Sequence, residues 1–223
     1  MQLTTIIGAT LATTGYEEMA HEAAARFRRF TGCHCLILTA DGTDAYGMKF
    51  ALPHLAGGRV MFFFDSDLFF IRPVPVAQFV GMEGLAAVPD PAALHDTFCR
   101  HDAEHLGFLP ERYVNTGLMV FNSADSRVVQ AFDRASVLMA EKWAGLHAQV
   151  EDVTEQSMLN LALHQHQLPT QFLPQAWNCY LHAAQFGHIA TIPAKPYCIH
   201  AAGVPLAQKH ETLRRQCAVF EAL

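Results

Sequence analysis

Residues 60–67 read VMFFFDSD, so that five apolar residues lead directly into two aspartates. An unbroken apolar run of this length is typical of a strand buried on both faces, as in a parallel sheet covered by helices. Ligands of open α/β sheets bind outside the carboxyl ends of such strands. Asp65 and Asp67 would emerge there on the same side if the strand geometry continued. Because two neighbouring carboxylates suit a hard divalent cation, the segment predicts a metal site, with a solvated turn as the alternative.

The segments around this strand alternate between strand and helix patterns. Short apolar runs predict further strands at 3–9, 35–38, 85–88 and 114–121. Helical spacing predicts helices at 17–30, 46–55, 126–143, 154–164 and from about residue 206 to the end. This alternation is typical of an α/β domain. With 223 residues, of which 51% are hydrophobic, we expect a single domain around one sizeable core.

Composition argues against several classes of function. The net charge is −6 and no run of lysine and arginine occurs, so we expect no contact with nucleic acid. No apolar run reaches the length of a membrane span, and the N-terminus lacks the pattern of a signal peptide. The six scattered cysteines are typical of reduced thiols. We therefore expect a cytoplasmic protein without integral membrane contact, while a peripheral contact stays open.

A second group of polar residues lies near the C-terminus. Residues 197–200 read as a short strand that ends at His200, with Gly203 and Lys209 following. A histidine that joins two carboxylates suits manganese or a similar metal. Gly203 would let the backbone approach a phosphate, and Lys209 would supply a point charge for it. The alternative for His200 is an ordinary loop histidine, because the chain contains 13 histidines.

Two further segments carry polar residues in unusual places. Residues 113–122 read YVNTGLMVFN, in which Asn115 and Gly117 interrupt an apolar strand. This interruption predicts either a β-bulge or a close approach of the backbone to a ligand. Glu155 and Gln156 lie in the first turn of a predicted helix, where Glu155 could simply complement the helix dipole.

Taken together, these motifs resemble glycosyltransferase family 8, whose members include glycogenin and bacterial galactosyltransferases. The resemblance covers nearly the whole chain and keeps the family's order. Its motifs are Leu11, Thr13 and Tyr16; Lys49; Asp65-Ser66-Asp67; Val88-Pro89-Asp90; Asn115-Thr116-Gly117; Gln156, Leu159 and Asn160; Leu173-Pro174 with Trp177-Asn178; and His200, Gly203 and Lys209.

The resemblance implies a GT-A-type, Rossmann-like mixed sheet flanked by helices in a single domain. Residues 1–90 would form the nucleotide-binding half, and 91–223 the acceptor-side half and closing segment. The implied activity is that of a retaining glycosyltransferase, which moves a hexose from a nucleoside diphosphate sugar, usually a UDP-sugar. Its cofactor would be Mn²⁺ or Mg²⁺, and its acceptor a glycan, a protein or a small molecule.

The resemblance also implies roles for individual residues. Asp65, Asp67 and His200 would ligate the metal. Glu155, Gln156 and Asn115 would be catalytic and face the donor sugar. The residues expected to bind the nucleotide or the donor are Thr10, Leu11, Thr13, Tyr16 (stacked on the base), Lys49, Ser66, Thr116, Gly117, Gly203 and Lys209.

The sequence departs from the family's pattern at three places. Glu155 stands where the family usually has aspartate, which lengthens that side chain by one methylene. Thr13-Thr14-Gly15 replaces the usual Thr-Asn, which affects the preference for uridine. The spacing from Gly203 to Lys209 is longer than usual, which makes Lys209 the least secure of the donor-binding residues.

Two other functions compete with the transferase hypothesis. Residues 101–105 read HDAEH, which matches the H-x-x-E-H pattern of one group of zinc peptidases, although the segment could equally form an acceptor-binding lid. A protein that binds sugar nucleotides without transferring them is the second alternative. The intact set of Asp65, Asp67 and His200 argues against it.

Overall fold

The computed structural model describes residues 6–40, 45–90, 112–141, 155–181 and 195–222. The strands are β1 (Ile6–Ala12), β2 (His34–Thr39), β3 (Val60–Phe64), β4 (Leu68–Phe70), β5 (Leu85–Pro89), β6 (Val114–Asn122), β7 (Thr170–Phe172), β8 (Cys179–Tyr180) and β9 (Cys198–His200). The helices are α1 (Glu17–Thr31), α2 (Ala45–Ala56), α5 (Ser126–Glu141), α6 (Glu155–Gln165) and α7 (Leu206–Glu221), with short 3₁₀ helices η2 (Val76–Phe79) and η5 (Gln175–Trp177).

The main sheet has six strands in the order β2-β1-β3-β6-β5-β7. Strand β3 pairs in parallel with β1 and antiparallel with β6, and β6 is also antiparallel to β5. The sheet is therefore mixed, as expected. The first strand continues past the predicted end at Ala9, because Thr10, Leu11 and Ala12 still pair with β2.

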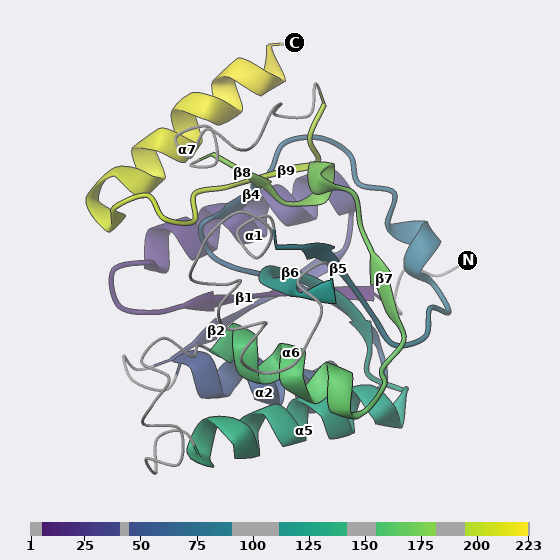
Figure 1. Ribbon diagram of the computed structural model, residues 1–223. Helices are drawn as coiled ribbons and strands as arrows, with labels where there is room; N and C mark the ends of the chain where they lie inside the picture. Colours follow the sequence, from purple (N-terminus) through teal and green to yellow (C-terminus); the bar gives the residue numbers. More distant parts are fainter. Residues whose placement is uncertain (1–5, 41–44, 91–111, 142–154, 182–194, 223) are drawn as a thin grey trace.

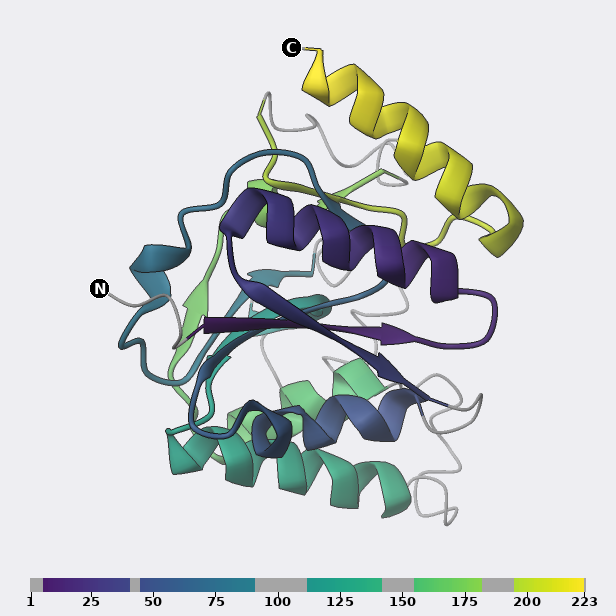
Figure 2. The same cartoon turned by 180° about the vertical axis from the view of Figure 1, so that it is seen from behind.

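Both faces of this sheet are buried under helices, which explains the unbroken apolar run of β3. Phe62 and Phe64 point into a core with α1, and Met61 and Phe63 point into the opposite core. In Figures 1 and 2, α1 lies between the sheet and α7, while α2, α5 and α6 cover the other face. Helix α1 packs so closely that a β-carbon on Gly8 would lie 2.4 Å from the ring of Phe27.

A second, three-stranded sheet has the order β4-β9-β8. Strand β4 runs antiparallel to β9, with Leu68 opposite His200, and β8 runs parallel to β9, with Tyr180 opposite His200. The small sheet therefore joins three segments that are far apart in the sequence and brings them to one end of β3.

None of the described helices combines the length and the apolar character needed to cross a membrane.

Candidate active site

The two aspartates lie in a turn, because strand geometry stops at Phe64. The amide of Asp65 donates to the carbonyl of Gly117 at 2.8 Å, and the amide of Leu68 donates back to the carbonyl of Asp65 at 3.0 Å. The condition under which alternation along a strand would place both carboxylates on one side, continued strand geometry, is therefore not met. The chain turns here because β3 and β4 belong to different sheets.

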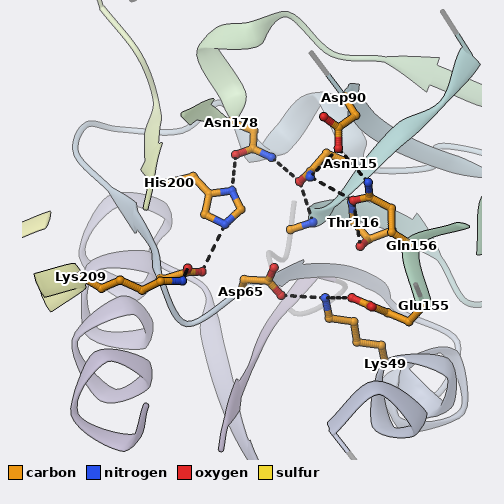
Figure 3. Close-up of polar contacts among 12 residues, drawn as sticks. Lys49, Asp65, Asp90, Asn115, Thr116, Glu155, Gln156, Asn178, His200 and Lys209 are labelled. Atoms are coloured by element: carbon orange, nitrogen blue, oxygen red, sulfur yellow. Dashed lines mark hydrogen bonds and ion pairs between the residues drawn. The ribbon is translucent and has the colours of Figure 1, made fainter. Parts of the chain in front are cut away.

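His200 reaches the aspartates through the pairing of β4 with β9. The amide of Ala201 donates to the carbonyl of Asp67 at 3.0 Å, which fixes the register at this end of the small sheet. One ligand atom from each of Asp65, Asp67 and His200 can be chosen so that all three lie within 4.8 Å of one another. Asp67 and His200 are buried, whereas the side chain of Asp65 is 28% exposed. The structure thus brings together the three predicted metal ligands, of which Figure 3 labels Asp65 and His200.

Asp67 has two nitrogen partners, one on each carboxylate oxygen. His200 Nε2 lies 3.2 Å from Asp67 Oδ1, and Lys209 Nζ donates to Asp67 Oδ2. Burial alone would raise the pKa of Asp67, but the charges and hydrogen bonds of His200 and Lys209 outweigh it and hold that pKa well below its usual value. A metal ion that binds Asp67 must therefore compete with Lys209.

Lys49 connects the cluster to the first turn of α6. Its Nζ lies 3.0 Å from Asp65 Oδ1 and 3.2 Å from Glu155 Oε1. Although burial opposes the charged form, the two carboxylates raise the pKa of Lys49 above its usual value. Lys49 therefore holds Glu155 close to the candidate metal ligands.

Side-chain amides form a hydrogen-bond network beside the cluster. Asn115 Nδ2 donates to Asp90 Oδ2 at 3.1 Å and to Gln156 Oε1 at 3.0 Å. Gln156 Nε2 also donates to Asp90 Oδ2, at 2.8 Å, and the amide of Thr116 donates to Gln156 Oε1 at 3.0 Å. Helix α6 is thereby tied to β6 at the predicted sugar-facing residues.

Asp90 and Asn178 belong to this network but were given no role in the sequence analysis. Asn178 Nδ2 donates to Asn115 Oδ1 at 2.7 Å, and Asn178 Oδ1 lies 2.9 Å from His200 Nδ1. Both residues fall within motifs that resemble family 8. Asp90 also follows an apolar strand directly, as Asp65 does, and this signal could have identified it.

The Asn115–Gly117 interruption coincides with an irregularity in strand pairing, which is the first of the two interpretations. The pairing of β5 with β6 shifts register between Ala87 and Pro89, so the strand is irregular there. A β-carbon on Gly117 would lie 2.5 Å from His200 Cε1 and 3.1 Å from Asp65 Oδ2. The close approach made by the glycine is thus to the candidate metal ligands.

The other residues predicted to bind the donor are described by their burial and by contacts outside the three candidate metal ligands. Lys209 Nζ lies 5.4 Å from the centre of the Tyr16 ring. Gly203 is exposed and has a left-handed backbone with φ of 76°. The side chains of Leu11 and Ser66 are buried, and Thr13 accepts a hydrogen bond from the amide of Tyr16. The buried hydroxyl of Thr10 has no hydrogen-bond partner among the described residues.

The donor set of the cluster fits a divalent cation. Two carboxylates and one imidazole nitrogen are ligands that manganese and similar ions accept. Gln156 Nε2 and the exposed part of Asp65 leave polar groups for a substrate beside it. His101, Glu104 and His105, the residues of the peptidase hypothesis, lie outside the described residues.

Comparison with solved structures identifies proteins that share this fold. No family model and no curated protein matches the sequence. Among solved structures, the bifunctional glycosyltransferase WbbM without ligands is 12% identical with a TM-score of 0.67. The match covers all of this chain and 53% of WbbM, so the chain spans about half the length of that protein.

Two other glycosyltransferases match over nearly their whole length. The galactosyltransferase LgtC, in complex with donor and acceptor sugar analogues, is 12% identical with a TM-score of 0.63, and the match covers 94% of this chain and 95% of LgtC. Mouse xyloside xylosyltransferase 1 without ligands is 10% identical with a TM-score of 0.56, covering 88% of this chain and 97% of that enzyme. The chain therefore has the GT-A glycosyltransferase fold, built as a six-stranded mixed sheet flanked by helices in a single domain.

Proposed function

We propose that this protein is a retaining glycosyltransferase of family 8, which transfers a hexose from a UDP-sugar to a glycan, protein or small-molecule acceptor and depends on Mn²⁺ or Mg²⁺. The observation that carries the proposal is the cluster of Asp65, Asp67 and His200 at the carboxyl end of β3 in a GT-A fold. When bound there, a divalent cation supplies charge stabilisation for the diphosphate leaving group.

Lys209 and the turn at Gly203 are the groups that we assign to the diphosphate. Lys209 enters the cluster from α7 and contacts Asp67, so a short movement of its flexible side chain would transfer its charge to a phosphate oxygen. Gly203 lies in the exposed turn before α7, where its left-handed backbone excludes most other residues. Tyr16, beneath Lys209, is the candidate for stacking on the base.

Gln156 and Glu155 are the groups that we assign to the donor sugar. Gln156 Nε2 has two hydrogens, and among the described residues only Asp90 accepts one, so the other is available to a hydroxyl. Glu155 is paired with Lys49, which reduces the nucleophilicity of its carboxylate. This pairing favours an orienting role for Glu155 and same-face attack, in which the leaving phosphate takes the proton of the acceptor.

Calorimetric titration with UDP, with and without Mn²⁺, tests the proposal. We expect binding that requires the metal in the wild type and is lost in Asp67→Asn, followed by turnover of one member of a panel of UDP-sugars. Binding of GDP in place of UDP would overturn the assignment of the base. Metal-dependent UDP binding without hydrolysis or transfer of any UDP-sugar would instead indicate an inactive binding protein. Zinc retained through purification, with no nucleotide binding at all, would favour the peptidase hypothesis.

A further inference from the structure

The orientation of Asn115 is fixed by the backbone of its own strand. The amide of Gly117, which can only donate, donates to Asn115 Oδ1 at 2.8 Å. The other end of the amide, Nδ2, faces Asp90 Oδ2 and Gln156 Oε1. The amide of Thr116 in turn identifies Gln156 Oε1 as an oxygen, because it donates to that atom at 3.0 Å. Two backbone N–H groups therefore determine which end of each side-chain amide is the acceptor.

Asn115 in turn orients Asn178. The atom of Asn178 that lies 2.7 Å from Asn115 Oδ1 must be Nδ2, because two oxygens at that distance would repel each other. Asn178 is fully buried, so its oxygen is shielded from solvent, and it faces His200 Nδ1 at 2.9 Å. An oxygen acceptor at this position requires the proton of the imidazole to sit on Nδ1.

When the ring is neutral, the opposite nitrogen of His200 is thereby left without a proton. Nε2 faces Asp67 Oδ1 at 3.2 Å. Without the Asn178 acceptor, a neutral ring would carry its proton on Nε2 and donate it to this carboxylate. A flipped ring would not relieve this, because it would turn the carbons Cδ2 and Cε1 toward Asn178 Oδ1 and Asp67 Oδ1 in place of the two nitrogens. Two facing acceptors are stable when a cation binds both.

We infer that Asn115 and Asn178 are positioning residues that hold the proton of His200 on Nδ1 and so reserve Nε2 as a metal ligand beside Asp67. The inference deepens the proposed metal-dependent transfer and rests on it. Asn115 already makes two donated and two accepted hydrogen bonds, which is the full capacity of an amide, so it has none left for the donor sugar. We call the chain of hydrogen bonds from Asn115 through Asn178 to His200 the relay. Gln156, the residue assigned to the sugar, also bonds to Asn115, so Asn115 holds both Gln156 and, through Asn178, the metal ligand His200.

Nitrogen NMR of protein labelled with ¹⁵N-histidine tests the inference without any metal or substrate. At alkaline pH we expect His200 Nδ1 to carry a proton in the wild type, with the His200 signals identified by their loss in His200→Ala. In Asn178→Leu the acceptor is gone, and we expect the proton to leave Nδ1 and move to Nε2. A bare Nδ1 in the wild type, or a proton that stays on Nδ1 in Asn178→Leu, would overturn the inference.

Manganese affinity, measured by the EPR signal of free Mn²⁺, is the second readout. We expect Asn178→Leu to weaken binding by about 10–100-fold, as loss of an outer hydrogen-bond partner of a histidine ligand typically does. The matched control is Asn122→Leu, which loses bonds to Met82 and Ala124 at the far end of β6 and should leave affinity unchanged. Equal affinity in Asn178→Leu and the wild type would contradict the inference. A wild type with its proton on Nδ1 but no affinity for Mn²⁺ would support the relay and overturn the proposed metal-dependent function.

Discussion

Gly117 and His200 are packed so closely that a β-carbon on residue 117 would come within 2.5 Å of the ring carbon Cε1. The same β-carbon would lie 2.8 Å from Asn115 Oδ1 and 3.1 Å from Asp65 Oδ2. The absence of a β-carbon at position 117 of β6 is therefore what allows the imidazole of His200 and the carboxylate of Asp65 to converge. A glycine in the middle of an apolar strand is here a requirement of the site.

Replacing this glycine should damage metal binding more than the fold. We expect Gly117→Ala to lose about 1–3 kcal/mol of unfolding free energy from overpacking, and to bind Mn²⁺ at least about tenfold more weakly because His200 or Asp65 must move. Gly8→Ala is the matched control, because its β-carbon would meet the Phe27 ring at 2.4 Å, away from the cluster. Urea unfolding and Mn²⁺ titration of both variants check this. Equal manganese affinity in the two variants would contradict the role of Gly117.

Lys209 should have opposite effects on the metal and on the nucleotide. Because Lys209 occupies Asp67 Oδ2, we expect Lys209→Met to bind Mn²⁺ alone about 3–10-fold more tightly, or about 0.7–1.4 kcal/mol. The same variant should bind UDP more weakly at saturating Mn²⁺, since the diphosphate loses a cation. Lys195→Met removes the same charge from an exposed position that lies outside the cluster and should change neither affinity. A fall in both affinities would indicate that Lys209 does not compete with the metal.

Acid should remove the stabilisation that Asp67 contributes. Its pKa is held below the usual value by His200 and Lys209, so the contribution is complete above about pH 4 and is lost as the pH falls toward the folded-state pKa. We expect the difference in unfolding free energy between the wild type and Asp67→Asn to be constant near neutral pH and to shrink below about pH 4. Urea titrations from neutral pH to pH 3 measure that difference. A difference that grows on acidification would contradict a lowered pKa of Asp67 in the folded protein.

Lys49 should contribute to the free energy of unfolding because its ammonium group pairs with two carboxylates. Lys49→Met leaves Asp65 and Glu155 without their shared cation, and we expect a loss of about 2–3 kcal/mol. This is below the range for fully buried pairs, because the Asp65 side chain is 28% exposed. The double variant Lys49→Met/Glu155→Gln should recover part of the loss, since one unpaired charge is removed. Chemical denaturation of the three proteins checks this, and a double variant that is no more stable than the single one would contradict it.

The sequence was sufficient to predict the elements whose pattern is local. Strand β3 has the bounds Val60–Phe64 expected from its apolar run, because a strand covered on both faces excludes polar residues along its whole length. Helix α1 begins at Glu17 as expected, and Gly32 ends it in the left-handed conformation. The alternation of such elements also predicted the α/β class, whereas the mixed sheet was implied only by the resemblance to family 8.

The contacts of the site were decided only by the tertiary structure. Asp67 meets His200 because β4 pairs with β9, and no local pattern records which distant strands will pair. The turn at Asp65, the pairing of Lys49 with Glu155 and the position of Asn178 beside His200 depend on the same packing. The sequence alone thus determined which residue types stand at the ends of strands. Only the folded chain determined which of their atoms face one another, because burial and hydrogen bonding between distant segments select that geometry.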